Sequence, residues 1–124
     1  NNLSNIKERI ETHCFVVAVN QQSQIVGFSS ITSQGYLHSM FVHKDFQGEG
    51  IATMLLEEIE RYAITAGITR ITSEVSLTAR PFFEKKGYVV EKEQKRKANQ
   101  LSLTNFLMAK EVAFLEYYNK RVTD

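Results

Sequence analysis

The residues most able to do chemistry are two glycines, Gly48 and Gly50, which are separated only by Glu49. Glycine lets the backbone turn tightly, and the apolar pattern that follows predicts a helix beginning near Ile51. The first N–H groups of a helix have no partner within the helix, and the helix dipole adds positive potential at that end. The spacing therefore predicts an anion cradle that holds phosphate groups through main-chain amides.

The residues after Gly50 exclude two common phosphate-binding loops. A Walker-type loop ends in Gly-Lys-Ser/Thr, whereas Ile51 and Ala52 follow Gly50 here. A dinucleotide-binding fingerprint needs a third glycine and a later acidic partner, and the chain has neither at the required spacing. A plain turn that only caps the helix stays open as the alternative.

Two runs, 47–52 (Gln-Gly-Glu-Gly-Ile-Ala) and 79–88 (Ala-Arg-Pro-Phe-Phe-Glu-Lys-Lys-Gly-Tyr), resemble motifs of one family, the GNAT superfamily of N-acetyltransferases. The run 47–52 is similar to the Gln/Arg-x-x-Gly-x-Gly/Ala motif of that family. Residues 79–88 resemble its Phe-Tyr-Glu-Lys-x-Gly-Phe/Tyr signature. The likeness runs from about Cys14 to Val112, with the family's first strand and first helix missing. It implies an α/β (α+β) GNAT fold, in which a mixed central sheet of about six strands has a splayed parallel pair and is flanked by helices.

The resemblance implies acetyl-CoA as cosubstrate and transfer of its acetyl group to a primary amine by direct attack in a ternary complex. The pantetheine arm would pair with backbone groups of Met40, Phe41 and Val42, and an N–H near Met40 or Phe41 would polarise the thioester carbonyl. The pyrophosphate would meet the loop backbone at Gln47, Gly48, Glu49, Gly50, Ile51, Ala52 and Thr53. The carboxylate of Glu49 is expected to face solvent, because it would repel a phosphate. An ordinary buried strand is the alternative for residues 40–42.

Phe83 departs from the family pattern, because many members carry at this position the tyrosine that protonates the departing thiolate. A phenyl ring can pack along the coenzyme but has no proton to give. Tyr36 or Tyr88 could supply the acid, although both are better explained as ordinary strand and core tyrosines. The departure keeps open a second function, an acetyl-CoA-binding sensor or interaction module without turnover.

Two residues are candidates for the base that deprotonates the attacking ammonium. Glu74 lies on a strand with Thr72 and Ser76 on the same face, and it matches a family position often filled by glutamate. His38 is expected to share a face with Met40 and Val42, and its ordinary pKa near 6.5 suits proton transfer. A solvated strand glutamate, a hydrogen-bonded histidine and a water chain are the alternatives.

The elements that must position these residues alternate along the chain. Ser4 is expected to cap a short helix that carries Ile6 and Ile10 and ends near Thr12. Apolar runs and turn residues predict six strands, at 15–20, 25–31, 36–42, 70–76, 88–94 and 103–110. An amphipathic helix from Ile51 is expected to end at Gly67, and a short helix opened by Pro81 at Gly87. The strands at 36–42 and 70–76 should be parallel, because a helix connects them.

The chain has 124 residues and a net charge of +1, which predicts one domain at 1–112 followed by a tail at 113–124. No signal segment or membrane span is evident, and a buried Cys14 suits a cytoplasmic location. We expect no metal site, because the histidines are scattered, and no nucleic-acid or membrane partner. The acceptor would be a small-molecule or peptide amine. The apolar tail makes a homodimer, or a scaffold that assembles through the tail, a third reading.

Overall fold

A computed structural model describes residues 3–10 and 13–112, and their strands form two sheets. In order, the elements are β1 (Ser4–Ile10), β2 (His13–Val19), β3 (Ile25–Thr32), β4 (Leu37–Val42), the 3₁₀ turn η1 (Lys44–Phe46), α1 (Ile51–Thr65), β5 (Arg70–Ser76), α2 (Arg80–Lys85), β6 (Val89–Ala98) and β7 (Leu101–Glu111). The first sheet has the order β1-β2-β3-β4 and the second β5-β7-β6. All strand pairs within the two sheets are antiparallel. The six strands and the two helices expected from residue 15 onward are confirmed, in the expected order.

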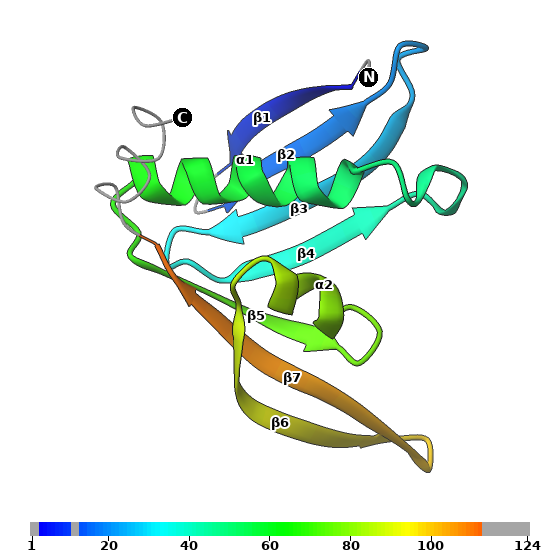
Figure 1. Cartoon of the computed structure of the whole chain (residues 1–124), viewed down its shortest axis with the longest axis vertical. Coiled ribbons are helices and arrows are strands. Elements are labelled where there is room, and N and C mark those ends of the chain that lie inside the picture. The colour runs from blue at the N-terminus through cyan, green and yellow to red at the C-terminus, as the bar shows by residue number, and fades with distance from the viewer. Residues whose placement is uncertain (1–2, 11–12, 113–124) are drawn as a thin grey trace.

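The two sheets meet at β4 and β5, which run parallel and touch at a single bridge, Tyr36 to Thr72. Beyond this bridge the described residues form no further ladder between the two strands. Figure 1 shows β4 and β5 diverging toward their C-terminal ends, with α2 between them in this view. The splayed parallel pair is therefore present.

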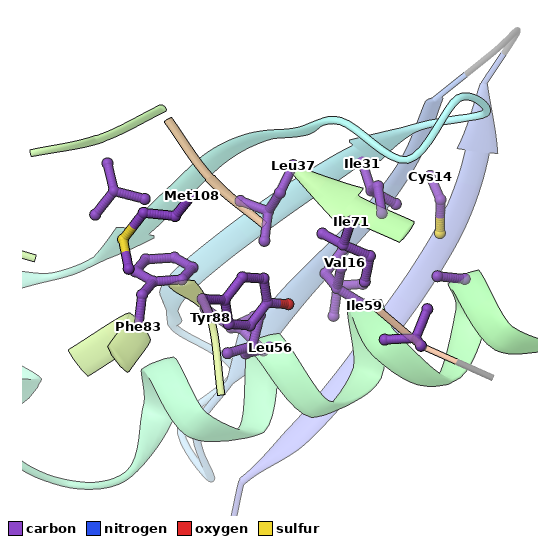
Figure 2. Close-up of a cluster of buried hydrophobic side chains, with 14 of the residues drawn as sticks. Cys14, Val16, Ile31, Leu37, Leu56, Ile59, Ile71, Phe83, Tyr88 and Met108 are labelled. Atoms are coloured by element: carbon purple, nitrogen blue, oxygen red, sulfur yellow. The ribbon is translucent and has the colours of Figure 1, made fainter. Parts of the chain in front are cut away.

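Both helices cover the same face, which we call the helix face. Leu55, Leu56 and Ile59 of α1 are fully buried there against β2 and β3, as the spacing of three and four residues requires. Figure 2 shows Leu56 and Ile59 close to side chains from both sheets, including Leu37 and Ile71. The opposite face, which we call the open face, has no described helix over it. Cys14 is buried on the helix face, as predicted.

Glycine ends both helices through the same backbone motif. Gly67 follows α1 with φ +81°, and Ile68 N–H donates to Ala63 C=O at 2.8 Å. Gly87 follows α2 with φ +94°, and Tyr88 N–H donates to Phe83 C=O at 3.0 Å. This left-handed cap satisfies carbonyl groups that would otherwise lack partners. Each cap turns the chain directly into the following strand.

The helix expected after Ser4 is wrong, because Ser4–Ile10 is strand β1. It pairs antiparallel with β2 over its whole length, from Ser4–Val19 to Ile10–His13. A spacing of four residues, as between Ile6 and Ile10, is even and therefore also fits one face of a strand. Pairing with β2 favours the strand over the helix. Without β1, the main-chain N–H and C=O groups along this edge of β2 would have no partners.

Candidate functional site

The predicted anion cradle lies at the N-terminus of α1. Gly48 and Gly50 both have φ +82°, a left-handed conformation that favours glycine. A Cβ atom added to either would meet nothing within 4 Å, so the space beside both residues is open. Gly50 is also the N-cap of α1, and no side chain caps the first amides there. The first turn of α1 therefore presents N–H donors and the positive end of the dipole to this space.

A cavity of about 310 Å³ lies in front of the cradle. It is lined by Val42, Gln47, Gly48, Gly50, Ile51, Ala52, Thr53 and Phe82. All of these except Phe82 were expected to contact the coenzyme. Glu49 is exposed and does not line the cavity, in keeping with a carboxylate that faces solvent. The residues that line the cavity are thus glycines, apolar residues and two uncharged polar residues, and none is basic.

The cradle stands at the open end of β4, where main-chain groups face the gap between the sheets. Ser39 C=O accepts from Ser29 Oγ at 2.6 Å and His43 N–H donates to Val26 C=O at 2.8 Å, so both residues face β3. Main-chain groups alternate sides along a strand, which leaves Met40 and Val42 facing β5 and turns Phe41 toward β3. Of the three residues expected to pair with pantetheine, the geometry favours Met40 and Val42.

The facing edge of β5 has the same character. Thr72 N–H donates to Gly35 C=O at 3.0 Å, and by alternation the main chains of Glu74 and Ser76 face β4. Buried Ser73 closes the root of the gap, since its Oγ donates to Leu37 C=O at 3.0 Å. Hydrogen bonds therefore join β4 and β5 at one end only. An extended ligand arm therefore fits between them as an added strand would.

On the open face, Tyr36 joins the two candidate bases. Its hydroxyl donates to Glu74 Oε1 at 3.4 Å, and its ring lies 6.0 Å from that of His38, centroid to centroid. Burial, the charge of Glu74 and their hydrogen bond raise the pKa of Tyr36, so its hydroxyl stays protonated at neutral pH. The structure thus brings His38 and Glu74, which are far apart in sequence, close to Tyr36 beside the gap between β4 and β5.

The expected face of His38 is wrong. A register shift in the β3–β4 pairing makes His38 an extra residue between Leu37 and Ser39. Such a bulge reverses the alternation of side chains, so Met40 and Val42 pack on the helix face while His38 is exposed on the other. Its ring lies 6.2 Å from that of His13, which alternates with the buried residues of β2. This correction moves His38 to the same face as Glu74.

Phe83 and Tyr88 both lie in the core on the helix face. Phe83 is 4% exposed, and its ring stacks edge-on with those of Phe82 and Tyr88. Phe82, one residue earlier on α2, is the aromatic residue that lines the cavity. Tyr88 donates from its hydroxyl to Glu60 Oε2 at 2.8 Å, so that group is already engaged away from Glu74. Contact of Phe83 with a coenzyme stays a prediction, and Tyr36 is the better placed tyrosine.

No group of three His, Cys, Asp or Glu side chains that could hold a metal occurs in residues 3–10 and 13–112. Neither α1 nor α2 has the length and apolar character to cross a membrane. The expected tail at 113–124 lies outside the described residues, and so does any assembly built on it.

Two strands that part at the tip of a helix, with open amides at that tip, give this α/β domain a geometry suited to a phosphate-containing ligand. The chain matches over residues 2–111 the family model described as an acetyltransferase (GNAT) domain. The match covers most of the chain, so this protein belongs to the GNAT family of acetyltransferases. The fold and family expected from the sequence are confirmed.

Individual relatives agree with this assignment. The chain is 30% identical over 103 residues to the uncharacterized N-acetyltransferase YafP of Escherichia coli K12, covering 82% of this chain and 63% of that protein. It is 32% identical over 74 residues to the peptidyl-lysine N-acetyltransferase YjaB of Salmonella typhimurium, covering 60% of this chain and 49% of that one. The chain therefore spans less than two thirds of the length of either relative.

Among solved structures, the chain is similar to a GCN5-related N-acetyltransferase from Rhodopseudomonas palustris. The TM-score is 0.74 at 29% sequence identity, over 81% of this chain and 62% of that one.

Proposed function

We propose that this chain transfers an acetyl group from acetyl-CoA to a primary amine, by direct attack within a ternary complex. The observation that carries the proposal is the pair of parted strand edges, which opens onto a helix tip free of side-chain caps. Edges of this kind need hydrogen-bond partners, and a pantetheine arm has amide groups that supply them. A pyrophosphate would bind the amides between Gln47 and Thr53.

In the proposed reaction, residues of the helix face bind the coenzyme and residues of the open face act on the amine. Acetyl-CoA supplies an activated thioester when bound. Main-chain N–H of Met40 is the donor best placed to stabilise a developing oxyanion, an interaction worth about 3 kcal/mol in comparable enzymes. Phe82 bounds the cavity beside the cradle. Glu74 and His38, on the open face, serve the amine.

The proposed reaction balances without an acidic tyrosine at position 83. An alkylammonium group with a pKa of about 10.4 is mostly charged at neutral pH, so Glu74 first accepts one proton, directly or through water. The freed amine nitrogen bonds to the acetyl carbon, and the carbon–sulfur bond breaks with its electron pair on sulfur. The second nitrogen proton passes through water to the thiolate. His38 is the alternative base.

Thiol release from acetyl-CoA, measured with and without a panel of primary amines, tests the proposal. We expect amine-dependent release, with kcat about 100-fold lower in Glu74→Gln, the usual effect of losing a general base. His38→Asn is the matched variant, and the larger loss of the two identifies the base. Acetyl-CoA that binds in calorimetry while no amine accelerates release would favour the second candidate, a sensor without turnover. That candidate is supported by the buried phenylalanine at position 83.

A further inference from the structure

An unusual group of hydrogen-bond acceptors lies on the open face beside Glu74. Gln94 Oε1 and Asn105 Oδ1 are buried, yet neither accepts a hydrogen bond from any described residue. Buried polar atoms without partners are rare in folded proteins, and each calls for an explanation. The two residues pair directly across β6 and β7. They are therefore neighbours, and their two oxygens form one local acceptor site.

The strand register places this pair on the same face as Glu74. Asn105 also pairs with Ser76 of β5, and Glu74 lies two residues earlier on that strand. The intervening Val75 and its partner Phe106 are buried in the core, so Glu74, Asn105 and Gln94 all belong to the open face. Three acceptor groups thus lie on one face in neighbouring rows of the sheet, and Glu74 among them accepts from the hydroxyl of Tyr36.

The side chain of Arg96 covers this group. Arg96 pairs with Leu103, whereas Glu74 pairs with Leu107, on the other side of the row that contains Asn105. Arg96 Nη2 nevertheless donates to Glu74 Oε2 at 3.3 Å. The link must therefore pass over Asn105 and beside Gln94. The Arg96 side chain is 64% exposed and that of Glu74 33%, and an ion pair so open to water contributes little stability and parts readily.

We infer that this arrangement is the acceptor site, and that it selects amines that also carry a carboxylate or similar oxyanion; the inference rests on the proposed function. An ammonium group has three N–H donors, which match the carboxylate of Glu74 and the amide oxygens of Gln94 and Asn105. Arg96, displaced from Glu74, turns its planar set of donors to the oxyanion of the same molecule. The ion pair of the free protein is exchanged for two equivalent contacts with the substrate.

A matched pair of probes tests the selection, β-alanine against propylamine, which have the same length and similar basicity. With acetyl-CoA, we expect kcat/KM for β-alanine to exceed that for propylamine by at least about tenfold, the size of a charge-assisted hydrogen bond. Arg96→Gln should abolish this ratio, because the oxyanion of β-alanine then has no guanidinium to bind. Lys95→Gln is the control, because Lys95 is exposed, neighbours Arg96 in sequence and points to the other face of β6; it should leave the ratio unchanged.

A second variant separates binding from structure. In Asn105→Leu an unpartnered buried oxygen is lost, so the thermal midpoint should stay level or rise, while KM for both amines rises severalfold. A purely structural asparagine would instead lower the midpoint. Equal kcat/KM for the two amines in the wild type, or a ratio that survives Arg96→Gln, overturns the acceptor-site inference alone. A wild-type chain that binds acetyl-CoA but releases thiol with neither probe nor any other amine overturns the proposed function, and this inference with it.

Discussion

The helix face and the open face of the same strands present different chemical groups to a ligand. On the helix face, the proposed coenzyme contacts come from main-chain amides, glycines and close apolar packing, as at Gly48, Gly50 and Phe82. On the open face they come from ionisable and aromatic side chains, as at Tyr36 and Glu74. A common coenzyme needs invariant geometry, which backbone supplies, whereas an acceptor needs chemistry that single substitutions can change. One split sheet therefore separates the fixed half of a reaction from the adaptable half.

Adjacent residues of β3 give the largest test of this comparison. A Cβ atom on Gly27 would lie 2.8 Å from Phe41 O and 2.9 Å from Ile51 Cγ2, so Gly27→Ala must push the first turn of α1 away. We expect a loss of about 2–3 kcal/mol in the free energy of unfolding, as for other overpacked cores. Phe28→Ala removes a whole ring, yet on the open face, where Phe28 is 40% exposed, and should cost about 1 kcal/mol or less. Urea unfolding of both variants measures these losses. A larger loss in Phe28→Ala than in Gly27→Ala would contradict the assignment of the two faces.

The two ends of α1 provide the second test. Gly50 and Gly67 have φ +82° and +81°, and a Cβ on either would meet nothing within 4 Å. Alanine at each position therefore carries the same backbone strain, but only Gly50→Ala places a methyl group in the cradle. We expect calorimetry to show acetyl-CoA affinity reduced about tenfold or more in Gly50→Ala, equivalent to one lost charge-assisted hydrogen bond. In Gly67→Ala the affinity should stay within about twofold. Equal affinities in the two variants would place the phosphates elsewhere.

One polar cluster on the helix face departs from the comparison and gives the smallest test. Tyr88 donates to Glu60, and Lys110 Nζ lies 3.1 Å from Glu60 Oε2, linking α1 to the second sheet. Burial, together with the charge and hydrogen bond of Glu60, raises the pKa of Tyr88 above its usual value. A raised pKa contributes stability below the unfolded value of about 10 and loses it as the pH rises further.

The measurement is the free energy of unfolding of Tyr88→Phe and wild type between pH 8 and pH 11. Above about pH 10 the wild type should lose up to about 1.4 kcal/mol per pH unit more than Tyr88→Phe, because only the unfolded wild type ionises at this residue. Below about pH 9 the difference should be constant. Parallel profiles over the whole range would show that Tyr88 is not held in its neutral form.

The sequence predicted best those features that depend on glycine and on hydrophobic spacing. The loop at Gly48 and Gly50, the amphipathic helix and the caps at Gly67 and Gly87 have local causes, so neighbouring residues were enough to find them. The six strands followed from apolar runs between turns. Each of these signals lies within a few residues of the feature it predicts.

The features that were missed depend on pairing between distant segments. A bulge moved His38 to the other face, and alternation along β4 separated Phe41 from Met40 and Val42. The acceptor role inferred for Gln94 and Asn105 needs the register of β5, β6 and β7, which polar residues in two strands do not reveal. Phe82, not Phe83, lines the cavity because of how α2 is rotated against the sheet. No single-residue signal in the sequence pointed to any of these.

Strand β1 lies at the end of its sheet, so among the described strands its outer row of main-chain groups has no neighbour. Such a row invites pairing between copies of a protein and eventual aggregation. Lys7 and Glu8 lie exposed on this strand, and Lys7 Nζ is held 2.7 Å from Glu58 of α1. Charged side chains on an edge strand disfavour pairing with a further strand, because that pairing would take the charges out of water. The segment that was expected to be a helix therefore also opposes edge-to-edge pairing of the first sheet with another copy of the protein.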